Sequence, residues 1–303
     1  MTEVLENKYL IDPFEEAVAY ETLWTIKGMT EKKLSDVFTQ YDAMPSDVLK
    51  NFLGMIPDED LKQHISEVRK YLQSRFSKFS ISINRDFQYP TELRKVKNPI
   101  ELFYYKGNLD LLTTKAVSIV GARKVSKDGI RRAKKLSAQL VENGYNIVSG
   151  LAAGVDTAAH EAAIASGGKT IGVIGTPIDE YYPKENKNLQ DKIAEEYLLI
   201  SQVPFYRHKI EHFKAHKNNF PRRNKTMAAI SDATIIVEAS DTSGSLTQAR
   251  ACLHQGKKLF ILNSCFENPA ITWPSFYEKQ GAKRVENIED ILKLLEGEEC
   301  GKN

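Results

Sequence analysis

The segment KNNFPRRNK, residues 217–225, places an aromatic ring and a proline inside a run of cations. Lys217, Arg222 and Arg223 could contact phosphate groups, and the ring of Phe220 could stack on a base. A charged groove with an aromatic platform holds single-stranded nucleic acid without reading its sequence, whereas a duplex hides the faces of its bases. A second interpretation stays open, in which Phe220 packs into the core and the arginines form ion pairs.

Three glycine-bearing turns could supply further anion-binding groups. Each follows a short apolar run and precedes a helical stretch; the turns are GARKVSKDG (121–129), GLAAGVDTAAH (150–160) and SDTSGSLTQAR (240–250). Backbone N–H groups at such helix starts can converge on an anion, aided by the helix dipole. We therefore expect a phosphate-binding rim, with Gly121, Gly150 and Gly244 shaping its floor.

These turns do not match the common nucleotide-binding fingerprints. The first lacks the G-x-G-x-x-G spacing, the second offers only G-x-x-x-G, and no acidic residue closes the second apolar run where a ribose would need one. The chain has no G-x-x-x-x-G-K-[ST] loop either. The residues thus argue against dinucleotide and ATP-loop chemistry, and they leave a mononucleotide or a polymer backbone open.

Polar residues near the turns form no recognisable catalytic constellation. Asp156 and His160 lie four residues apart on a predicted helix, Glu238 closes a predicted strand, and Ser243 and Ser245 lie in the third turn. No nucleophile with its base and no carboxylate cluster is evident. We therefore predict no enzymatic activity and no catalytic residue, and we expect His160 to be a packing or capping residue.

Three histidines raise the question of a metal site. His208, His212 and His216 recur every four residues, so a continuous helix would place them on one face. The segment is crowded with lysines, and no carboxylate or cysteine completes a site. We predict a solvated face rather than a metal centre, and no cofactor.

The composition is that of an ordinary globular protein of 303 residues, with 42% hydrophobic and 27% charged residues. No stretch approaches the roughly 18 apolar residues of a membrane span, and the N-terminus lacks the apolar core of a signal peptide. The three cysteines form no close pair, which favours reduced thiols in the cytoplasm. Residues 207–225 hold seven cations and one acid, a local density that favours an anionic partner such as nucleic acid.

The hydrophobic pattern divides the chain into three segments. Residues 1–80 carry apolar residues at helical spacing, with Thr30 and Ser46 where N-caps would fall, and predict a small helical module with a structural or protein-contact role. Residues 81–115 form a connector with helix-breaking prolines and one strand-like run, ELFYYKG. Residues 116–303 form the predicted core.

In the core, apolar runs alternate with helical stretches. The runs are AVSIVG (116–121), YNIVSG (145–150), KTIGVIG (169–175), YLLIS (197–201), ATIIVEA (233–239) and KKLFILN (257–263). Strands that are apolar on both faces and separated by helices predict an α/β fold, a Rossmann-like and mostly parallel sheet covered by helices. In such sheets ligands bind beyond the carboxyl ends of the strands, where the three glycine turns would lie.

Several of these motifs, in this order, resemble the DNA-processing protein A family, also called DprA or Smf. The similar segments are DFQYPTELRKVKNPIELFYYKGN, SIVGARK, IVSGLAAGVDTAAHEAAIASGGKTIGVIGTPIDEYYPKEN, NFPRRNKTMAAIS and VEASDTSGSLTQARACLHQGKKLF, between about residues 80 and 285. The resemblance implies an extended Rossmann fold, a homodimer, and binding of single-stranded DNA without a cofactor. It also implies that the protein protects incoming DNA and loads a RecA-type recombinase onto it. Relatives with a SAM-like (sterile-alpha-motif-like) domain agree with the helical module.

The resemblance also assigns site residues. The family's G-S-R turn falls on Gly121, Ala122 and Arg123, with alanine in place of the usual serine, and its lysine and phenylalanine fall on Lys217 and Phe220. The predicted DNA-binding set is Gly121, Ala122, Arg123, Gly150, Lys217, Phe220, Arg222, Arg223, Asn224, Gly244 and Ser245. We expect no winged-helix domain of the kind many relatives carry, because only about 40 residues follow the last predicted strand.

Two other classes of protein stay open. Nucleotide phosphoribohydrolases of the lysine-decarboxylase-like group share the Rossmann core and resemble P-G-G-x-G-T-x-x-E in a late turn, where the glutamate is catalytic. Here that turn reads TSGSLTQAR, with Gln248 and no glutamate, which disfavours hydrolysis. A nucleotide-sensing or scaffold module would instead bind a small nucleotide saturably and be indifferent to strand length.

Overall fold

One nine-stranded sheet runs through the part of the chain that the computed structural model describes, residues 11–55, 59–97 and 99–297. Its strand order is β1-β2-β6-β5-β4-β3-β7-β8-β9. All neighbours from β6 to β9 in this order are parallel, whereas β2 pairs antiparallel with both β1 and β6. The strands are β1 (Ser80–Ile83), β2 (Leu102–Gly107), β3 (Ala116–Val120), β4 (Asn146–Ser149), β5 (Thr170–Ile174), β6 (Leu198–Ser201), β7 (Ala233–Ile236), β8 (Lys258–Leu262) and β9 (Lys283–Val285).

The six strands expected in the core are present, and ELFYYKG forms β2 as predicted. The sequence does not predict β1 and β9, which form the two edges of the sheet. Serines alternate with isoleucines in β1, and β9 buries only Val285, so neither edge strand has the continuous apolar run that marks the inner strands. The prediction of a mostly parallel α/β sheet is confirmed.

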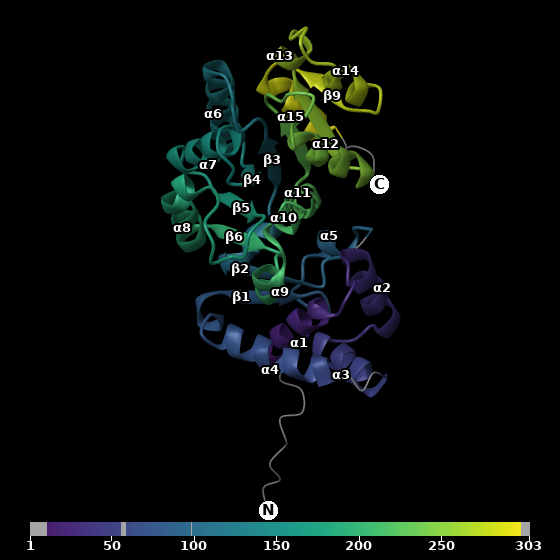
Figure 1. The fold of residues 1–303 in the computed structure, drawn as a ribbon. Coiled ribbons are helices and arrows are strands. Elements are labelled where there is room, and N and C mark those ends of the chain that lie inside the picture. Colours follow the sequence, from purple (N-terminus) through teal and green to yellow (C-terminus); the bar gives the residue numbers. More distant parts are fainter. Residues whose placement is uncertain (1–10, 56–58, 98, 298–303) are drawn as a thin grey trace, which may run out of the picture.

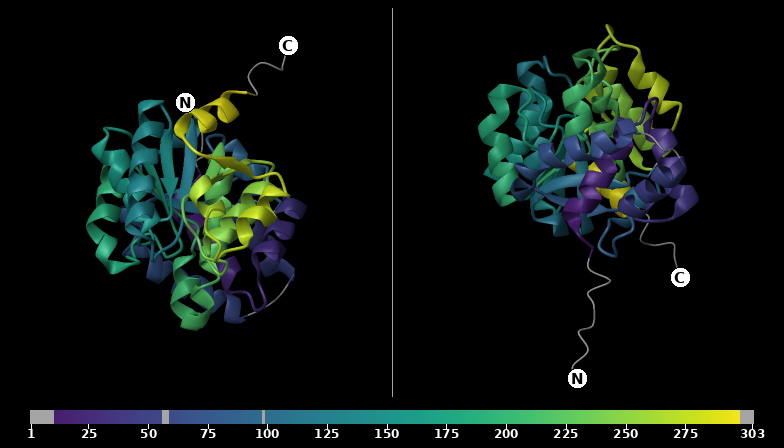
Figure 2. Two further views of the ribbon diagram at one scale, coloured as in Figure 1. Left: turned by 90° about the horizontal axis from the view of Figure 1, so that it is seen from above. Right: turned by 60° about the horizontal axis from the view of Figure 1, so that its bottom comes forward.

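Helices cover both faces of the sheet (Figures 1 and 2). Val117 and Ile119 of β3 pack with α6, α7 and α15, whereas Ala116 and Val120 pack with α11, α12 and α14. Because successive residues of a strand point to opposite faces, a strand between two helical layers is apolar throughout. The helices after β1 are α5 (Thr91–Arg94), α6 (Lys127–Glu142), α7 (Val155–Ala165), α8 (Lys187–Glu196), α9 (Phe205–Ile210), α10 (Phe213–His216), α11 (Asn219–Ala229), α12 (Ser245–His254), α13 (Asn263–Phe266), α14 (Trp273–Glu278), α15 (Ile288–Glu296) and the short 3-10 turns η2 (Leu109–Thr113) and η3 (Lys184–Asn186). Within the described ranges, no helix combines the length and the apolar character that crossing a bilayer requires.

The N-terminal helices pack together beside the antiparallel edge of the sheet (Figure 1). They are α1 (Pro13–Thr25), α2 (Glu31–Tyr41), α3 (Pro45–Met55) and α4 (Glu59–Gln73), followed by the 3-10 turn η1 (Phe76–Lys78). Their apolar residues, among them Leu23, Phe38 and Leu72, belong to the same buried cluster as Tyr104 of β2 and Phe205 of α9. The module is therefore docked on the core through side-chain packing, and its independence as a SAM-like domain stays a prediction.

One of the two predicted N-caps is confirmed. The Thr30 side chain accepts a hydrogen bond from the Lys33 N–H (3.2 Å) at the start of α2. Ser46 is not an N-cap, because α3 already begins at Pro45. Its N–H and hydroxyl instead donate to the carboxylate of Glu16 (2.9 and 2.7 Å), which joins α3 to α1.

A buried carboxylate joins the helical module to the core. Glu21 of α1 is fully buried and accepts hydrogen bonds from the Tyr104 hydroxyl (2.6 Å) and from the N–H groups of Phe205 (2.7 Å) and Tyr206 (2.9 Å). The two N–H groups belong to the first turn of α9, where backbone donors have no partner within the helix. Burial raises the pKa of Glu21 to about 7, against the opposing effect of these hydrogen bonds.

Replacing Glu21 with glutamine is expected to remove a pH dependence of stability. Because the folded pKa lies above the ordinary value of 4.5, the contribution of Glu21 is fully present below pH 4.5 and is lost as pH rises through about 7. A shift of this size corresponds to at most about 3 kcal/mol. In urea unfolding between about pH 5 and pH 8, the free energy of unfolding of the unaltered chain should fall relative to that of Glu21→Gln. A difference that does not change with pH would show that Glu21 does not titrate in this range.

Candidate functional site

A cavity of about 760 Å³ opens at the carboxyl ends of β3, β7 and β8 and is called here the strand-end cavity. β4 lies on one side of β3 and β7 on the other, so the connections leave the sheet in opposite directions and open a crevice between them. The Ala122 N–H donates to the Glu238 carbonyl (2.7 Å), and the Ser245 hydroxyl donates to the Gly121 carbonyl (2.8 Å). The cavity is lined by residues of all three glycine-bearing turns, which therefore meet at one edge of the sheet as predicted.

Two glycines of the second turn are required by close contacts. Gly154 has a φ of +84°, and a Cβ at this position would lie 2.4 Å from the Ala122 carbonyl oxygen. A Cβ on Gly150 would lie 1.2 Å from Nη1 of Arg223. Gly150 is itself buried and does not line the cavity, so its role differs from the predicted one: it leaves room for the guanidinium above it.

An arginine and two aromatic rings meet beside the strand-end cavity. The Arg123 guanidinium lies 5.4 Å from the ring centre of Phe220 and 5.8 Å from that of Tyr182, and the two rings are 5.5 Å apart. Phe220 is half-buried, since it lies against Gly175, where a Cβ would come within 2.7 Å of the ring. Tyr182 is 48% exposed. Phe220 thus packs partly against the core, as one interpretation of the sequence expected. It also lines the cavity, as the other interpretation expected.

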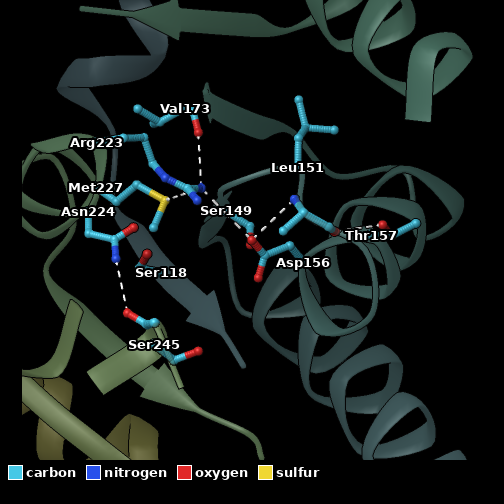
Figure 3. Close-up of polar contacts among 12 residues, drawn as sticks. Ser118, Ser149, Leu151, Asp156, Thr157, Val173, Arg223, Asn224, Met227 and Ser245 are labelled. Carbon is cyan, nitrogen blue, oxygen red and sulfur yellow. Dashed lines mark hydrogen bonds and ion pairs between the residues drawn. The ribbon is translucent and has the colours of Figure 1, made fainter. Parts of the chain in front are cut away.

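Arg223 forms a buried ion pair with Asp156 (Figure 3). Its Nη1 lies 3.9 Å from Asp156 Oδ2, donates to the Val173 carbonyl (3.2 Å) and contacts the Met227 sulfur (3.7 Å). Both side chains are about nine-tenths buried or more. Burial raises the pKa of Asp156 and lowers that of Arg223, while each charge opposes the shift of the other. Arg223 therefore lines the cavity, but its charge is partly neutralised by Asp156. It is not the freely accessible phosphate ligand that the sequence suggests.

The start of α11 decides which basic residues face the cavity. α11 begins at Asn219, so that Pro221 lies within its first turn. The proline is tolerated because N–H groups of the first turn have no partner within the helix. Arg222 is thereby turned toward the N-terminal module, 5.4 Å from the ring centre of Trp24 and 3.9 Å from the Glu31 carboxylate. Arg222 does not line the cavity, so the geometry gives no support to its predicted contact with DNA.

The remaining predicted residues lie in or near the cavity. Asn224 donates through Nδ2 to the Gly244 carbonyl (3.2 Å), and both line the cavity together with Ser245. Lys217 is exposed and directly follows α10, but it does not line the cavity. It lies three residues before Phe220 in the chain.

The three histidines do not share one helical face. His208 belongs to α9, while His216 belongs to α10 and its Nε2 lies 2.9 Å from the His208 carbonyl. The rings of these two residues stack with centres 3.6 Å apart, and His212 instead caps α10 by accepting from the Lys214 N–H. Across the described ranges, no three His, Cys, Asp or Glu side chains are arranged to hold a metal ion.

The polar groups that could act catalytically have structural partners. The Glu238 carboxylate accepts from the N–H (2.9 Å) and hydroxyl (2.6 Å) of Ser126 at the start of α6, and it contacts Arg132 at 3.3 Å. Gln248, at the position where a hydrolase would carry its glutamate, is buried with its amide 3.2 Å from the Thr234 hydroxyl. His160 is a buried packing residue as predicted, 2.6 Å from Thr170 Oγ1, and burial lowers its pKa to about 3.

Sequence reasoning missed three residues at this site, namely Tyr182, Ser126 and Arg132. Tyr182 lies in the segment EYYPKEN that follows β5, and all parallel strands end at the same edge of the sheet. That placement could have indicated a second aromatic ring near the cavity. The roles of Ser126 and Arg132 depend on the Glu238 side chain, which no local pattern connects to them.

Together the fold and the site define a class of protein: a doubly wound α/β protein with a glycine-rimmed cavity at its strand ends and an arginine–aromatic cluster beside it. The chain belongs to the DNA recombination-mediator protein A family, whose model matches residues 80–296. This confirms the resemblance drawn from the motifs.

Relatives and solved structures agree with this assignment. The DNA processing protein DprA of Streptococcus pneumoniae is 38% identical over 226 residues, 75% of this chain and 78% of the relative. Protein Smf of Borreliella burgdorferi is 31% identical over 287 residues, 91% and 86% of the two chains. None of these names denotes an enzymatic activity.

Two solved structures share the fold at similar identity. That of S. pneumoniae DprA superposes with a TM-score of 0.73 at 31% identity and covers 93% of this chain and 97% of its own. That of DprA from Helicobacter pylori, described with a unique single-stranded DNA binding mode, has a TM-score of 0.61 at 30% identity and covers 72% and 95%.

Proposed function

We propose that the protein binds single-stranded DNA at the strand-end cavity and delivers it to a RecA-type recombinase. The observation that carries the first part is the cluster of Arg123, Tyr182 and Phe220, which places a cation beside two partly exposed rings. Stacking on rings and pairing with phosphates are the two interactions that hold single strands without sequence readout. The single-stranded DNA binding described for H. pylori DprA supports the same proposal.

The geometry suggests how the strand is held. The side chains of Arg123 and Lys217 supply positive charge for phosphates. The exposed faces of Phe220 and Tyr182 offer surfaces on which bases can stack. Arg223 and Asp156 both line the strand-end cavity. They form a buried ion pair that carries no net charge.

Replacing Arg123 with alanine is expected to weaken binding of oligothymidylate and to flatten its salt dependence. Loss of one phosphate contact should lower the slope of log K against log salt by about 0.7 for a single strand. Fluorescence anisotropy across a salt series measures both quantities. The control is Arg131→Ala, because Arg131 is exposed on α6, pairs with Asp128 and lies outside the cavity lining. Equal affinities and slopes for Arg123→Ala and the unaltered chain would contradict the proposed site.

Recombinase delivery, a homodimer, protection of incoming DNA and a cytoplasmic location belong to the same proposal and are supported by membership of the family. A direct test compares RecA filament formation on DNA coated with a single-strand-binding protein, with and without this chain. We expect faster filament formation with the chain and no acceleration with Arg123→Ala. Acceleration by Arg123→Ala at concentrations where it does not bind DNA would separate delivery from the strand-end cavity.

A further inference from the structure

A second cavity, of about 490 Å³, lies on the other face of the same two helices that wall the strand-end cavity. On α11, Asn224 and Met227 line the first cavity, whereas Lys225 and Ala229 line the second. On α12, Gln248 lines the first cavity and Arg250 lines the second. The opposite wall of the second cavity is α5 together with residues 95–97 and Ile100. We call this cavity the α11–α12 groove.

The rim of the α11–α12 groove is positively charged. Its two carboxylates are each shared between two cations: Glu31 lies 3.1 Å from Lys225 and 3.9 Å from Arg222, and Glu92 lies 2.7 Å from Lys95 and 3.2 Å from Lys257. Lys97 and Arg250 are exposed and form no ion pair with any residue that the structure describes. The groove thus has six cationic side chains against two carboxylates, namely Lys95, Lys97, Arg222, Lys225, Arg250 and Lys257 against Glu31 and Glu92.

The floor of the groove is aliphatic. It includes Leu93, Val96, Ile100, Ala229 and Ala251, and the described lining holds no phenylalanine, tyrosine or tryptophan, its one ring being the imidazole of His254. A single strand of nucleic acid is held by stacking of its bases on rings, and the large rings suited to this lie at the strand-end cavity and not in this groove. Aliphatic floors instead take up aliphatic side chains.

We propose that the α11–α12 groove binds an acidic peptide segment of a partner protein. The carboxylates of the segment meet Lys97 and Arg250, and its aliphatic side chains enter the floor. Because the groove and the strand-end cavity lie on opposite faces of α11 and α12, the partner binds while DNA is held. The proposal rests on the proposed function only for this last point.

The test uses a fluorescein-labelled peptide of about twelve residues that alternates Glu or Asp with Leu. Its binding to the full chain is measured by anisotropy, with and without saturating oligothymidylate. We expect binding in both conditions, and at least about tenfold weaker binding to Arg250→Glu and to Lys97→Glu, since these reverse charges at the rim. The matched control is Arg131→Glu, an exposed charge reversal on α6 outside both cavities. Peptides with Gln and Asn for the acids, or with Ser for Leu, should bind at least about tenfold more weakly to the unaltered chain.

Three outcomes would overturn the proposal. Equal peptide binding by Arg250→Glu, Lys97→Glu and Arg131→Glu would show attraction to the basic surface in general. Competition of the peptide by oligothymidylate would place it in the strand-end cavity. A loss of oligothymidylate binding in Arg250→Glu and Lys97→Glu, equal to that in Arg123→Ala, would assign the groove to DNA. If Arg123→Ala binds DNA normally while the peptide binds as expected, the proposed DNA site at the strand-end cavity is wrong. The proposed peptide site in the α11–α12 groove is then still supported.

Discussion

Replacing Asp156 with alanine is expected to lower the free energy of unfolding by about 3–5 kcal/mol. Arg223 would keep its donor bond to the Val173 carbonyl but would lose the only carboxylate beside it among the described residues. Arg223 is 5% exposed, so its charge depends mainly on protein partners and not on solvent. Urea or guanidinium unfolding followed by circular dichroism measures the change.

The matched control removes both charges. In Asp156→Ala with Arg223→Met no charge is left buried, so the double variant should regain more than half of the stability that the single variant loses. Methionine is unbranched and can occupy much of the space above Gly150 that the arginine fills. A loss below about 1 kcal/mol in Asp156→Ala would show that Arg223 is already hydrated through the cavity, and the pair would then not be a structural element.

The cation run at residues 207–225 shows what charge density alone can and cannot predict. The sequence correctly marks the segment as unusual, but most of its cations have intramolecular partners. Arg207 pairs with Glu211 and lies over the ring of Trp24, and Lys225 pairs with Glu31. Trp24 and Glu31 lie in the N-terminal helical module, so a window of the sequence cannot separate the cations that hold α9 and α11 from those that face a ligand.

The strands and turns were predictable for a different reason. A strand buried between two helical layers must be apolar on both sides, so AVSIV and its neighbours stand out locally. Parallel strands end at one edge, so the three glycine turns could be placed together without knowledge of side chains. The orientation of the Arg222 and Arg223 side chains could not be predicted, because it depends on where α11 begins. A shift of two or three residues turns a side chain to another face of a helix.

The same limit applies to Phe220. Its half-buried state depends on Gly175, which follows β5 and leaves room for the ring. Nothing in the segment 217–225 points to that glycine. Only the structure shows that the Phe220 ring packs against Gly175 and still lines the cavity.

Replacing Phe220 with alanine is expected to weaken binding of oligothymidylate by about 1–3 kcal/mol, the range measured for loss of one stacked base. The slope of log K against log salt should stay unchanged, because the ring contacts no phosphate, and this separates Phe220→Ala from Arg123→Ala. Anisotropy over a salt series measures both.

Two comparisons decide whether stacking is the cause. Phe220→Tyr keeps the ring and should retain most of the affinity, whereas Phe220→Leu keeps apolar contact with Gly175 but loses the stacking face and should behave like Phe220→Ala. An oligonucleotide with abasic sites along its length removes the bases instead, and Phe220→Ala should lose no affinity for it relative to the unaltered chain. If Phe220→Ala weakens binding of the abasic and normal strands equally, the ring supports the position of Arg123, 5.4 Å away, and does not stack on a base.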